Sequence, residues 1–465
     1  MRGPARYFLF VFLACSGLAP AQGLDQALGW QAGPGRPQGA ALLLSDLHFD
    51  PFTDPSLAPA LAASPVTAWD AIFARGHGKA FPGYSDDCNW DLWRSLLSQL
   101  SAPGLRYDYG LVMGDYLAHQ FDKKYQRALG GGKQAYQAFV AKTLAYLDRS
   151  LGRALAKAPL YWALGNNDSD CGDFGLEPGG AFLKTQARAW ATVAADPAAA
   201  TDFSRGGYCD LALPGRGGRV LVLNTVIWSR RYDNPCGVSG ADPGKLELDW
   251  LAARLERDQD AGGPVTLIMH IPPGTNAFGA SLGLPLETFF RPEIQAPFLA
   301  LVRRYAGLIR LAFAGHTHFD DFKVYEPGGA PALAVHLAPS VGPSHGNNPS
   351  FQVLCYDRST AAPLDLATYT LCNLTSAARS GPQPDWQLEY GFKQAYGHAF
   401  DRAGLAAAAQ DIRSGGAARA DYESFYTGRA RSHSALGNEI WRPYSCAQTC
   451  FDPDEFEACL HAKAR

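Results

Sequence analysis

The chain has 465 residues, 47% of them hydrophobic, and a formal net charge of −3. This apolar content is enough for a buried core and excludes a mainly disordered protein. The near-neutral charge, without a basic stripe along the sequence, excludes a surface that binds nucleic acid electrostatically. No stretch approaches the ~20 unbroken apolar residues of a transmembrane helix, so we expect no transmembrane segment.

The N-terminal segment has the pattern of a secretory signal peptide. Arg2 and Arg6 precede an apolar stretch over 7–14, and Ala19-Pro20-Ala21 offers a cleavage site made of small residues. We therefore expect residues 1–21 to be a signal peptide and the protein to be secreted, either to the extracellular space or to the periplasm. A lipid anchor on Cys15 is the alternative, but the residues before it fit a lipidation site poorly.

Short apolar runs bounded by turn residues recur after residue 39, as expected of strands buried on both faces. Their ranges are 40–44, 109–113, 160–164, 220–223, 265–269, 309–314, 333–337 and 352–356. Between them, 136–155 and 246–255 have the apolar periodicity of amphipathic helices. This alternation predicts an α/β fold in which layered central β-sheets are flanked by helices. After about residue 380 the chain is rich in Ala and Tyr, and we expect a small α-helical C-terminal region there.

Nine of the ten cysteines remain once Cys15 is removed with the signal peptide. In an oxidising compartment most of them are expected to form disulfides. Their spacing lacks the paired Cys-x-x-Cys of zinc knuckles. The pairs that we consider are Cys355 with Cys372, and two cysteines within 446–459. The odd number leaves one thiol free or paired elsewhere.

Five short motifs, each at the end of an apolar run, supply seven candidate metal ligands: two aspartates, one asparagine and four histidines. They are Asp46-Leu47-His48, Gly114-Asp115, Gly165-Asn166-Asn167-Asp168, His270 and Gly315-His316-Thr317-His318. Loops at strand ends converge on one edge of a sheet, which holds them rigidly. Carboxylate and imidazole ligands suit zinc, manganese or iron. A carboxylate such as Asp115 can bridge two cations about 3.5–4 Å apart.

Each motif has a simpler interpretation when it is taken alone. An Asp-x-His at a strand end is more often a turn cap than a ligand, a lone Gly-Asp is uninformative, and His270 could be a core histidine. Gly-His-Thr-His is more specific, because two imidazoles at i and i+2 after an apolar run have little structural purpose. The ordered occurrence of all five motifs therefore favours a two-metal phosphoesterase site.

In this order the motifs resemble the calcineurin-like metallophosphoesterase superfamily, and the residues around them resemble its acid sphingomyelinase-like branch. The matching stretches are Ser45-Asp46-Leu47-His48-Phe49-Asp50, Gly114-Asp115-Tyr116-Leu117-Ala118-His119, His270-Ile271-Pro272-Pro273-Gly274, Gly315-His316-Thr317-His318-Phe319-Asp320-Asp321-Phe322, Ala338-Pro339-Ser340 with Asn347-Asn348-Pro349-Ser350-Phe351, and Trp441-Arg442-Pro443-Tyr444-Ser445-Cys446. The resemblance implies a metallophosphoesterase domain over 39–375. It also implies a helical, disulfide-containing region over 385–465 similar to the sphingomyelinase C-terminal domain.

Carried over residue by residue, the resemblance implies two divalent metal ions, Zn²⁺ first, with Mn²⁺ or Fe as alternatives. The expected ligands are Asp46, His48 and His318 for one ion, Asn166, His270 and His316 for the other, and Asp115 as the bridge. A metal-bound hydroxide would attack phosphorus while both cations neutralise the phosphoryl charge. His119, four residues after the bridging aspartate, would help to protonate the leaving group. The alternative for His119 is an ordinary surface histidine.

One departure from the family pattern concerns catalysis. The family commonly has Gly-Asn-His-Asp or Gly-Asn-His-Glu, whereas this chain has Asn167 at the histidine position. An asparagine donates a hydrogen bond but cannot deliver a proton, so help for a poor leaving group is weakened. Phosphoanhydrides, whose leaving group is a stable anion, would suffer least. The Gly-Asn-Asn-Asp string also resembles that of endopolyphosphatases.

The leading hypothesis is a secreted or periplasmic phosphodiesterase of the acid sphingomyelinase-like type, acting on nucleotide-like or lipid-headgroup diesters. The second is an endopolyphosphatase-like hydrolase, motivated by Asn167, whose substrate would be polyphosphate. The third, from another class, is a non-catalytic protein that keeps the fold to bind metal or ligand. The persistence of all seven expected ligands disfavours this third hypothesis.

Overall fold

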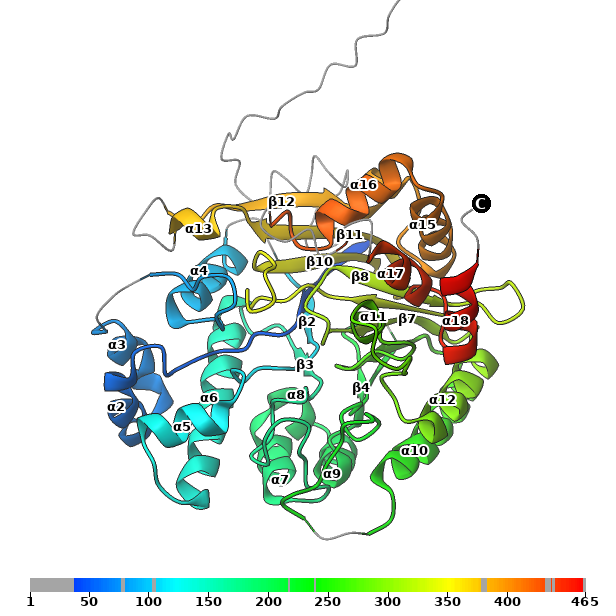
Figure 1. Cartoon of the computed structure of the whole chain (residues 1–465). Helices are drawn as coiled ribbons and strands as arrows, with labels where there is room; N and C mark the ends of the chain where they lie inside the picture. Colours follow the sequence, from blue (N-terminus) through cyan, green and yellow to red (C-terminus); the bar gives the residue numbers. More distant parts are fainter. Residues whose placement is uncertain are drawn as a thin grey trace, which may run out of the picture.

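The computed structural model describes residues 37–76, 80–102, 106–215, 218–237, 240–377, 383–430, 436 and 440–462. The predicted signal peptide over 1–21, with Cys15, lies outside these residues. Two six-stranded sheets form the centre of the molecule, with helices on the outer flanks (Figure 1). The predicted α/β class, with layered sheets between helices, is confirmed.

The first sheet combines three parallel strands with three antiparallel ones. Its order is β12 (Trp386–Gly391), β11 (Pro363–Leu371), β10 (Ser350–Asp357), β1 (Gln38–Leu44), β2 (Tyr109–Val112) and β3 (Leu160–Trp162). Strands β1, β2 and β3 are parallel, and Leu44, Val112 and Trp162 lie level with one another. The residues that follow these three strands therefore emerge at one edge of the sheet.

The second sheet contains four parallel strands with an antiparallel strand at each end. Its order is β4 (Cys209–Ala212), β5 (Arg219–Val222), β6 (Val265–Ile268), β7 (Ile309–Ala314), β9 (Leu333–Leu337) and β8 (Asp321–Tyr325). Val222, Ile268 and Phe313 lie level with one another, so β6 and β7 end side by side. The residues after β6 and β7 are those of the His270 and Gly315-His316-Thr317-His318 motifs.

The helices cover the outer faces of both sheets, with α4 and α6 on one flank and α10 and α12 on the opposite flank (Figure 1). The helices before β4 are η1 (Pro55–Leu57), α2 (Ala58–Ala63), η2 (Val66–Ala68), α3 (Trp69–Phe73), α4 (Trp90–Leu100), α5 (Phe121–Ala128), α6 (Lys133–Ala154), α7 (Ala181–Ala189), α8 (Ala191–Ala194) and α9 (Pro197–Gly206). Those after β5 are α10 (Pro243–Ala261), α11 (Ala277–Ser281), α12 (Pro292–Arg304), α13 (Leu374–Ala377), α14 (Phe392–Tyr396), α15 (Arg402–Ser414), α16 (Gly416–Phe425), α17 (Trp441–Ala447) and α18 (Pro453–His461).

Local sequence signals explain where α10 begins and ends. The Asp242 carboxylate accepts a hydrogen bond from the Gly244 backbone N–H, and Pro243 occupies the first turn, where its missing N–H costs nothing. Gly262 ends the helix with φ of 72°, a left-handed conformation that glycine adopts without strain. The apolar face buries Leu248, Leu251 and Leu255, which confirms the helix predicted over 246–255.

The C-terminal region is helical from α14 to α18, as predicted, but it begins with a strand. Strand β12 pairs antiparallel with β11 and extends the first sheet to its edge. Helix α15 packs against β8 and β9 of the second sheet. The division into domains over 39–375 and 385–465 stays a prediction.

Two disulfides join described cysteines, Cys171–Cys236 and Cys446–Cys459. The second confirms the pair expected within 446–459. Among the described cysteines, Cys88, Cys209, Cys355 and Cys450 form no disulfide, so the expectation that most of the nine cysteines are paired is wrong. The predicted pairing of Cys355 with Cys372 is therefore also wrong. The register between the strands explains this result. Cys355 lies opposite Asp365 on β11. Asp365 precedes Cys372 by seven residues, so the two cysteines are separated by roughly 20 Å along the strand, too far for a disulfide.

Candidate metal centre

The motifs that follow β1, β2 and β3 are joined through their backbones. The Asp46 N–H donates to the Gly114 carbonyl at 3.0 Å, and the His48 N–H donates to the Asp115 carbonyl at 2.9 Å. A Cβ atom on Gly165 would lie 2.1 Å from the Asp115 backbone nitrogen, so only glycine permits this approach. The sequence thus brings three loops into contact before any side chain is considered.

Five of the seven predicted ligands have a strained backbone conformation. Asp46, His48, Asp115, His316 and His318 have φ values of 49°, 44°, 54°, 73° and 69°, in the left-handed region that non-glycine residues rarely adopt. Each such residue costs on the order of 1 kcal/mol and persists only where the surrounding structure enforces it. Strain of this kind clusters at functional sites, which points to this edge of the two sheets.

The buried carboxylate of Asp168 holds two of these loops together. It accepts hydrogen bonds from the backbone N–H groups of Asp115, Tyr116, Leu117 and Gly165 at 2.8, 2.6, 3.2 and 2.7 Å. Burial, followed by the charge of Asp115, raises the pKa of the Asp168 carboxyl to about 7. Asp168 therefore orients the predicted bridging residue without itself facing the site.

The first group of donors contains Asp46, His48, His318 and Asp115. The His48 Nε2 atom lies 3.8 Å from Asp46 Oδ1, 3.5 Å from Asp115 Oδ2 and 3.2 Å from His318 Nε2. The His318 Nε2 atom lies 3.5 Å from Asp46 Oδ1. Donor atoms that bind one cation at about 2.1 Å lie roughly 3.0–3.4 Å from each other, so this group needs little movement to hold an ion.

The second group contains Asn166, His270, His316 and again Asp115. The Asn166 Oδ1 atom lies 3.1 Å from His270 Nε2 and 3.0 Å from His316 Nδ1. The His270 Nε2 atom lies 3.3 Å from Asp115 Oδ2. Asp115 Oδ2 therefore lies within 3.5 Å of a histidine from each group. The structure brings together all seven donors that the sequence predicted.

The electrostatics of the site suit a donor set of this kind. Burial lowers the pKa of both His48 and His316 to about 3, so these imidazoles are neutral and able to bind a cation. Burial raises the pKa of Asp46 to about 7. Burial opposes the charged forms of Asp115 and His270, but their mutual attraction outweighs it, lowering the pKa of Asp115 and raising that of His270 to about 9. Cation binding would displace the protons that this network holds.

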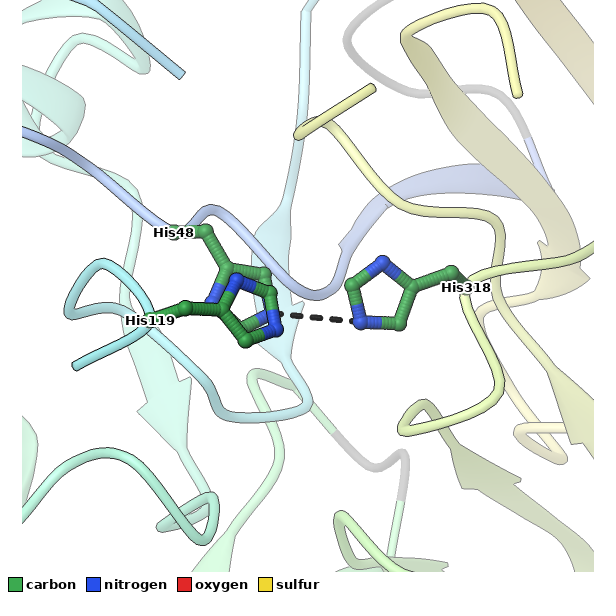
Figure 2. Close-up of side chains that lie close together, drawn as sticks. All are labelled: His48, His119 and His318. Atoms are coloured by element: carbon green, nitrogen blue, oxygen red, sulfur yellow. Dashed lines mark hydrogen bonds between the residues drawn. The ribbon is translucent and has the colours of Figure 1, made fainter. Parts of the chain in front are cut away.

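His119 lies beside the first group of donors. Its ring stacks on His48 with 3.9 Å between centroids, and Figure 2 shows both rings facing the side chain of His318. Ring nitrogens of these three histidines also converge closely enough to hold a metal ion. Position alone is therefore compatible with His119 as an additional ligand, and the role expected from the sequence stays a prediction.

Asp87 and Lys124 hold His119 in place. The Asp87 carboxylate lies 2.7 Å from His119 Nδ1, accepts the His119 backbone N–H at 3.1 Å, and accepts from Lys124 Nζ at 2.6 Å. Burial opposes protonation of His119, but the hydrogen bond and charge of Asp87 outweigh it and raise the His119 pKa. The same contacts lower the pKa of Asp87 to about 2 despite its burial.

Asn167 contacts the predicted bridging carboxylate. Its backbone N–H donates to Asp115 Oδ1 at 2.8 Å and its side-chain Nδ2 donates to Asp115 Oδ2 at 2.9 Å. The Asn167 side chain is buried, and the residue follows the donor Asn166 directly in the sequence. This position puts an amide where it can donate hydrogen bonds, although it cannot supply a proton.

Three residues near the donors were not singled out from the sequence. Asp87 follows no apolar run, so no strand-end pattern marked it. Asp168 belongs to a quoted motif, but its role could not be predicted, because it binds backbone N–H groups and these do not depend on residue type. His345, whose ring centroid lies 3.8 Å from that of His318, precedes the quoted Asn347-Asn348 stretch by two residues. Its short distance from this matching stretch was the only available signal.

Two sheets whose parallel strands deliver converging carboxylate, amide and imidazole donors to one edge define a metallohydrolase. The family model described as calcineurin-like phosphoesterase matches residues 41–320, more than half of the chain. The chain therefore belongs to the calcineurin-like phosphoesterase family and is a metal-dependent phosphoric ester hydrolase. The predicted family resemblance is confirmed.

Curated relatives are similar in sequence over most of the chain. Human acid sphingomyelinase-like phosphodiesterase 3b is 28% identical over 438 residues, which cover 90% of this chain and 89% of that protein. Human sphingomyelin phosphodiesterase is 30% identical over 378 residues, which cover 77% of this chain and 54% of that protein. A solved dimetal phosphatase from Danio rerio aligns with a TM-score of 0.37 and 11% identity, covering 72% of this chain and 96% of that one.

Proposed function

We propose that the chain is a secreted or periplasmic binuclear-metal phosphodiesterase of the acid sphingomyelinase-like type. Its substrates are small nucleotide-like or lipid-headgroup phosphodiesters. The observation that carries the proposal is the arrangement of seven donors in two groups that share Asp115. The relatives named as phosphodiesterases support the choice of a diester over a monoester.

The donor chemistry supports two divalent cations, with Zn²⁺ first and Mn²⁺ or Fe as alternatives. The first would be held by Asp46, His48 and His318, the second by Asn166, His270 and His316, with Asp115 between them. Such cations, when bound, lower the pKa of water and neutralise charge on the phosphoryl oxygens. The protein contributes preorganisation, because strained loops and the Asp168 hydrogen bonds fix the donors before substrate arrives.

His119 is the group that we assign to the leaving-group oxygen. Its Nδ1 atom faces Asp87, which leaves Nε2 as the nitrogen able to deliver a proton to substrate. Lys124 binds Asp50 and Asp87 at 2.7 and 2.6 Å and so restrains the carboxylate that positions His119. Asn167 would assist by hydrogen bonding to the phosphoryl group, without transferring a proton.

An endopolyphosphatase-like activity on phosphoanhydrides is the second candidate. Asn167 favours this activity. An asparagine cannot protonate the leaving group, and this loss slows hydrolysis least when the leaving group is already a stable anion. Membership of an enzyme family, with all seven donors gathered, disfavours the non-catalytic alternative.

Export rests on separate observations. The two disulfides between described cysteines fit an oxidising compartment. Among the described residues, no helix is both long and apolar enough to cross a bilayer. Residues 1–21 would then be removed as a signal peptide. The catalytic domain would span 39–375, and the helical region would span 385–465.

A substrate panel with metal removal tests the proposed function. Purified protein loaded with Zn²⁺ is assayed on bis(4-nitrophenyl) phosphate, sphingomyelin, ATP and polyphosphate, before and after dialysis against a chelator. We expect diester hydrolysis that falls to background on metal removal and returns when Zn²⁺, Mn²⁺ or Fe²⁺ is restored. Cleavage of anhydrides alone would replace the first choice with the second, and diester hydrolysis that survives chelation would contradict both.

A further inference from the structure

We propose that Arg231 forms an anion-binding subsite beside the candidate metal centre, which selects substrates carrying a second phosphate group. The inference rests on the proposed function, since the scissile diester would lie at the seven donors. It narrows the substrate class to diesters with a further phosphate. It also disfavours those whose neighbouring group is a cation, such as a choline headgroup.

Arg231 reaches the second group of donors through an aromatic side chain. Its guanidinium carbon lies 4.2 Å from the centroid of the Phe174 ring, a cation–π contact. The Phe174 ring in turn meets His316 edge to face, with 6.0 Å between centroids. Arg231 is therefore separated from a predicted ligand by one buried ring.

A second chain of contacts joins Arg231 to Asn166. The Arg231 guanidinium lies 3.6 Å from Asp173 Oδ2, and Asp173 Oδ1 accepts a hydrogen bond from Asn166 Nδ2 at 2.8 Å. The two chains of contacts are independent, and each ends on a predicted ligand of the same ion. They place the cationic group one side chain away from the centre, where an adjoining phosphate rather than the scissile one would lie.

The loops that carry these residues are tied together. Cys171 and Cys236 form a disulfide between the loop after β3 and the loop after β5. Within the closed segment, the Asp233 N–H donates to the Phe174 carbonyl at 3.1 Å, and the Leu176 N–H donates to the Asp233 carbonyl at 3.3 Å. Arg231 thus projects from a fixed rim, which lowers the entropy lost when it binds a ligand.

The existing ion pair leaves Arg231 available to a ligand. The Arg231 and Asp173 side chains are 70% and 50% exposed, and a surface pair of this kind contributes little to stability. Its 3.6 Å separation is longer than a hydrogen bond, so stacking on Phe174 orients the guanidinium more than Asp173 does. Guanidinium is always charged and binds phosphate oxygens in a bidentate manner.

The subsite adjoins the second group of donors, whereas His119 adjoins the first. His119 stacks on His48 in the first group, whereas Phe174 and Asp173 contact His316 and Asn166 in the second. The second phosphate would therefore belong to the part of the substrate that does not leave through His119. Nucleotides and phosphorylated lipid headgroups both supply such a group.

The test compares ligands that differ by one phosphate, using Arg231→Gln. Binding of orthophosphate and pyrophosphate to the Zn²⁺-loaded full chain is measured by calorimetry, which does not depend on turnover. Pyrophosphate binds bare metal sites well, so the readout is the ratio of its Kd to that of orthophosphate. We expect R231Q to reduce the advantage of pyrophosphate about tenfold, and Arg231→Lys to restore part of it.

The matched control is Arg205→Gln. Arg205 is 71% exposed and also pairs with one aspartate, Asp202, but on helix α9. An unchanged ratio in R205Q together with a reduced one in R231Q supports the subsite. A ratio that is the same in R231Q and wild type, or that falls equally in both variants, overturns it.

Two further ligand pairs identify the source of the second phosphate. AMP is compared with ADP, and inositol monophosphate with inositol bisphosphate, on wild type and R231Q. If the second phosphate increases affinity in the nucleotide pair, and this increase depends on Arg231, the substrate is a nucleotide. The same result in the inositol pair identifies a lipid headgroup. A gain in binding without any phosphodiester turnover would leave the subsite standing while contradicting the proposed function.

Discussion

Replacement of Asp115 by Asn is expected to remove most of the bound metal and nearly all activity. An amide keeps the shape of the side chain but loses the negative charge that two cations would share. Loss of a residue in the outer shell of a metal site typically costs 10–100-fold, so loss of the bridge should cost on the order of 10³-fold or more. Metal content by mass spectrometry and kcat/KM on bis(4-nitrophenyl) phosphate are the two measurements.

Asp249→Asn is the matched control for this variant. Asp249 is exposed on helix α10, so the same chemical change there should leave metal content and kcat/KM at wild-type values. Retention of two tightly bound ions in D115N would show that Asp115 is not the bridge. Circular dichroism of both variants separates loss of ligand from loss of fold.

Replacement of His119 by Ala is expected to slow hydrolysis in proportion to how poor the leaving group is. General acid catalysis contributes roughly 10²–10⁴-fold where an alkoxide must leave, and much less for 4-nitrophenolate, a stable anion. We therefore expect a large loss of kcat on alkyl diesters and a small loss on the nitrophenyl diester. A series of diesters with graded leaving groups measures this dependence directly.

Metal content separates the two roles compatible with the position of His119. A proton donor can be removed without loss of either ion, whereas a ligand in the cluster with His48 and His318 cannot. Asp87→Asn should give a smaller loss with the same dependence on leaving group, because it affects His119 only through positioning. Equal losses on all diesters, together with lost metal, would identify His119 as a ligand instead.

The central strands and the donor set could be predicted from the sequence for a simple physical reason. Strands buried on both faces appear as continuous apolar runs, and in parallel sheets the residues after such runs meet at one edge. Leu44, Val112 and Trp162 lie level in the structure, so Asp46, Asp115 and Asn166 had to emerge together. The order of the motifs along the chain predicted the remaining donors, His48, His270, His316 and His318.

Elements with polar or mixed sequences could not be predicted in the same way. Strand β8 carries buried Asp321 and Lys323, whose charges hide its strand character. Strand β12 lies in a segment that the Ala-rich residues after it made look helical. These assignments depend on pairing with other strands, β9 for β8 and β11 for β12, and the residues of β8 and β12 alone do not reveal that pairing.

The supporting residues of the site share that dependence. Asp87 and Arg231 contact side chains from other loops, and neither directly follows a predicted strand. That Cys355 forms no disulfide was also beyond sequence reasoning, because it depends on the register between β10 and β11. Proximity to the donors became visible only when the loops were placed in three dimensions.

Anomalous X-ray diffraction from crystals of the metal-loaded protein tests the two-metal centre most directly. The expected result is two peaks about 3.5–4 Å apart, one on each side of the Asp115 carboxylate, with Asp46, His48 and His318 around one and Asn166, His270 and His316 around the other. A single peak between His48, His119 and His318, with none near Asn166, would contradict it.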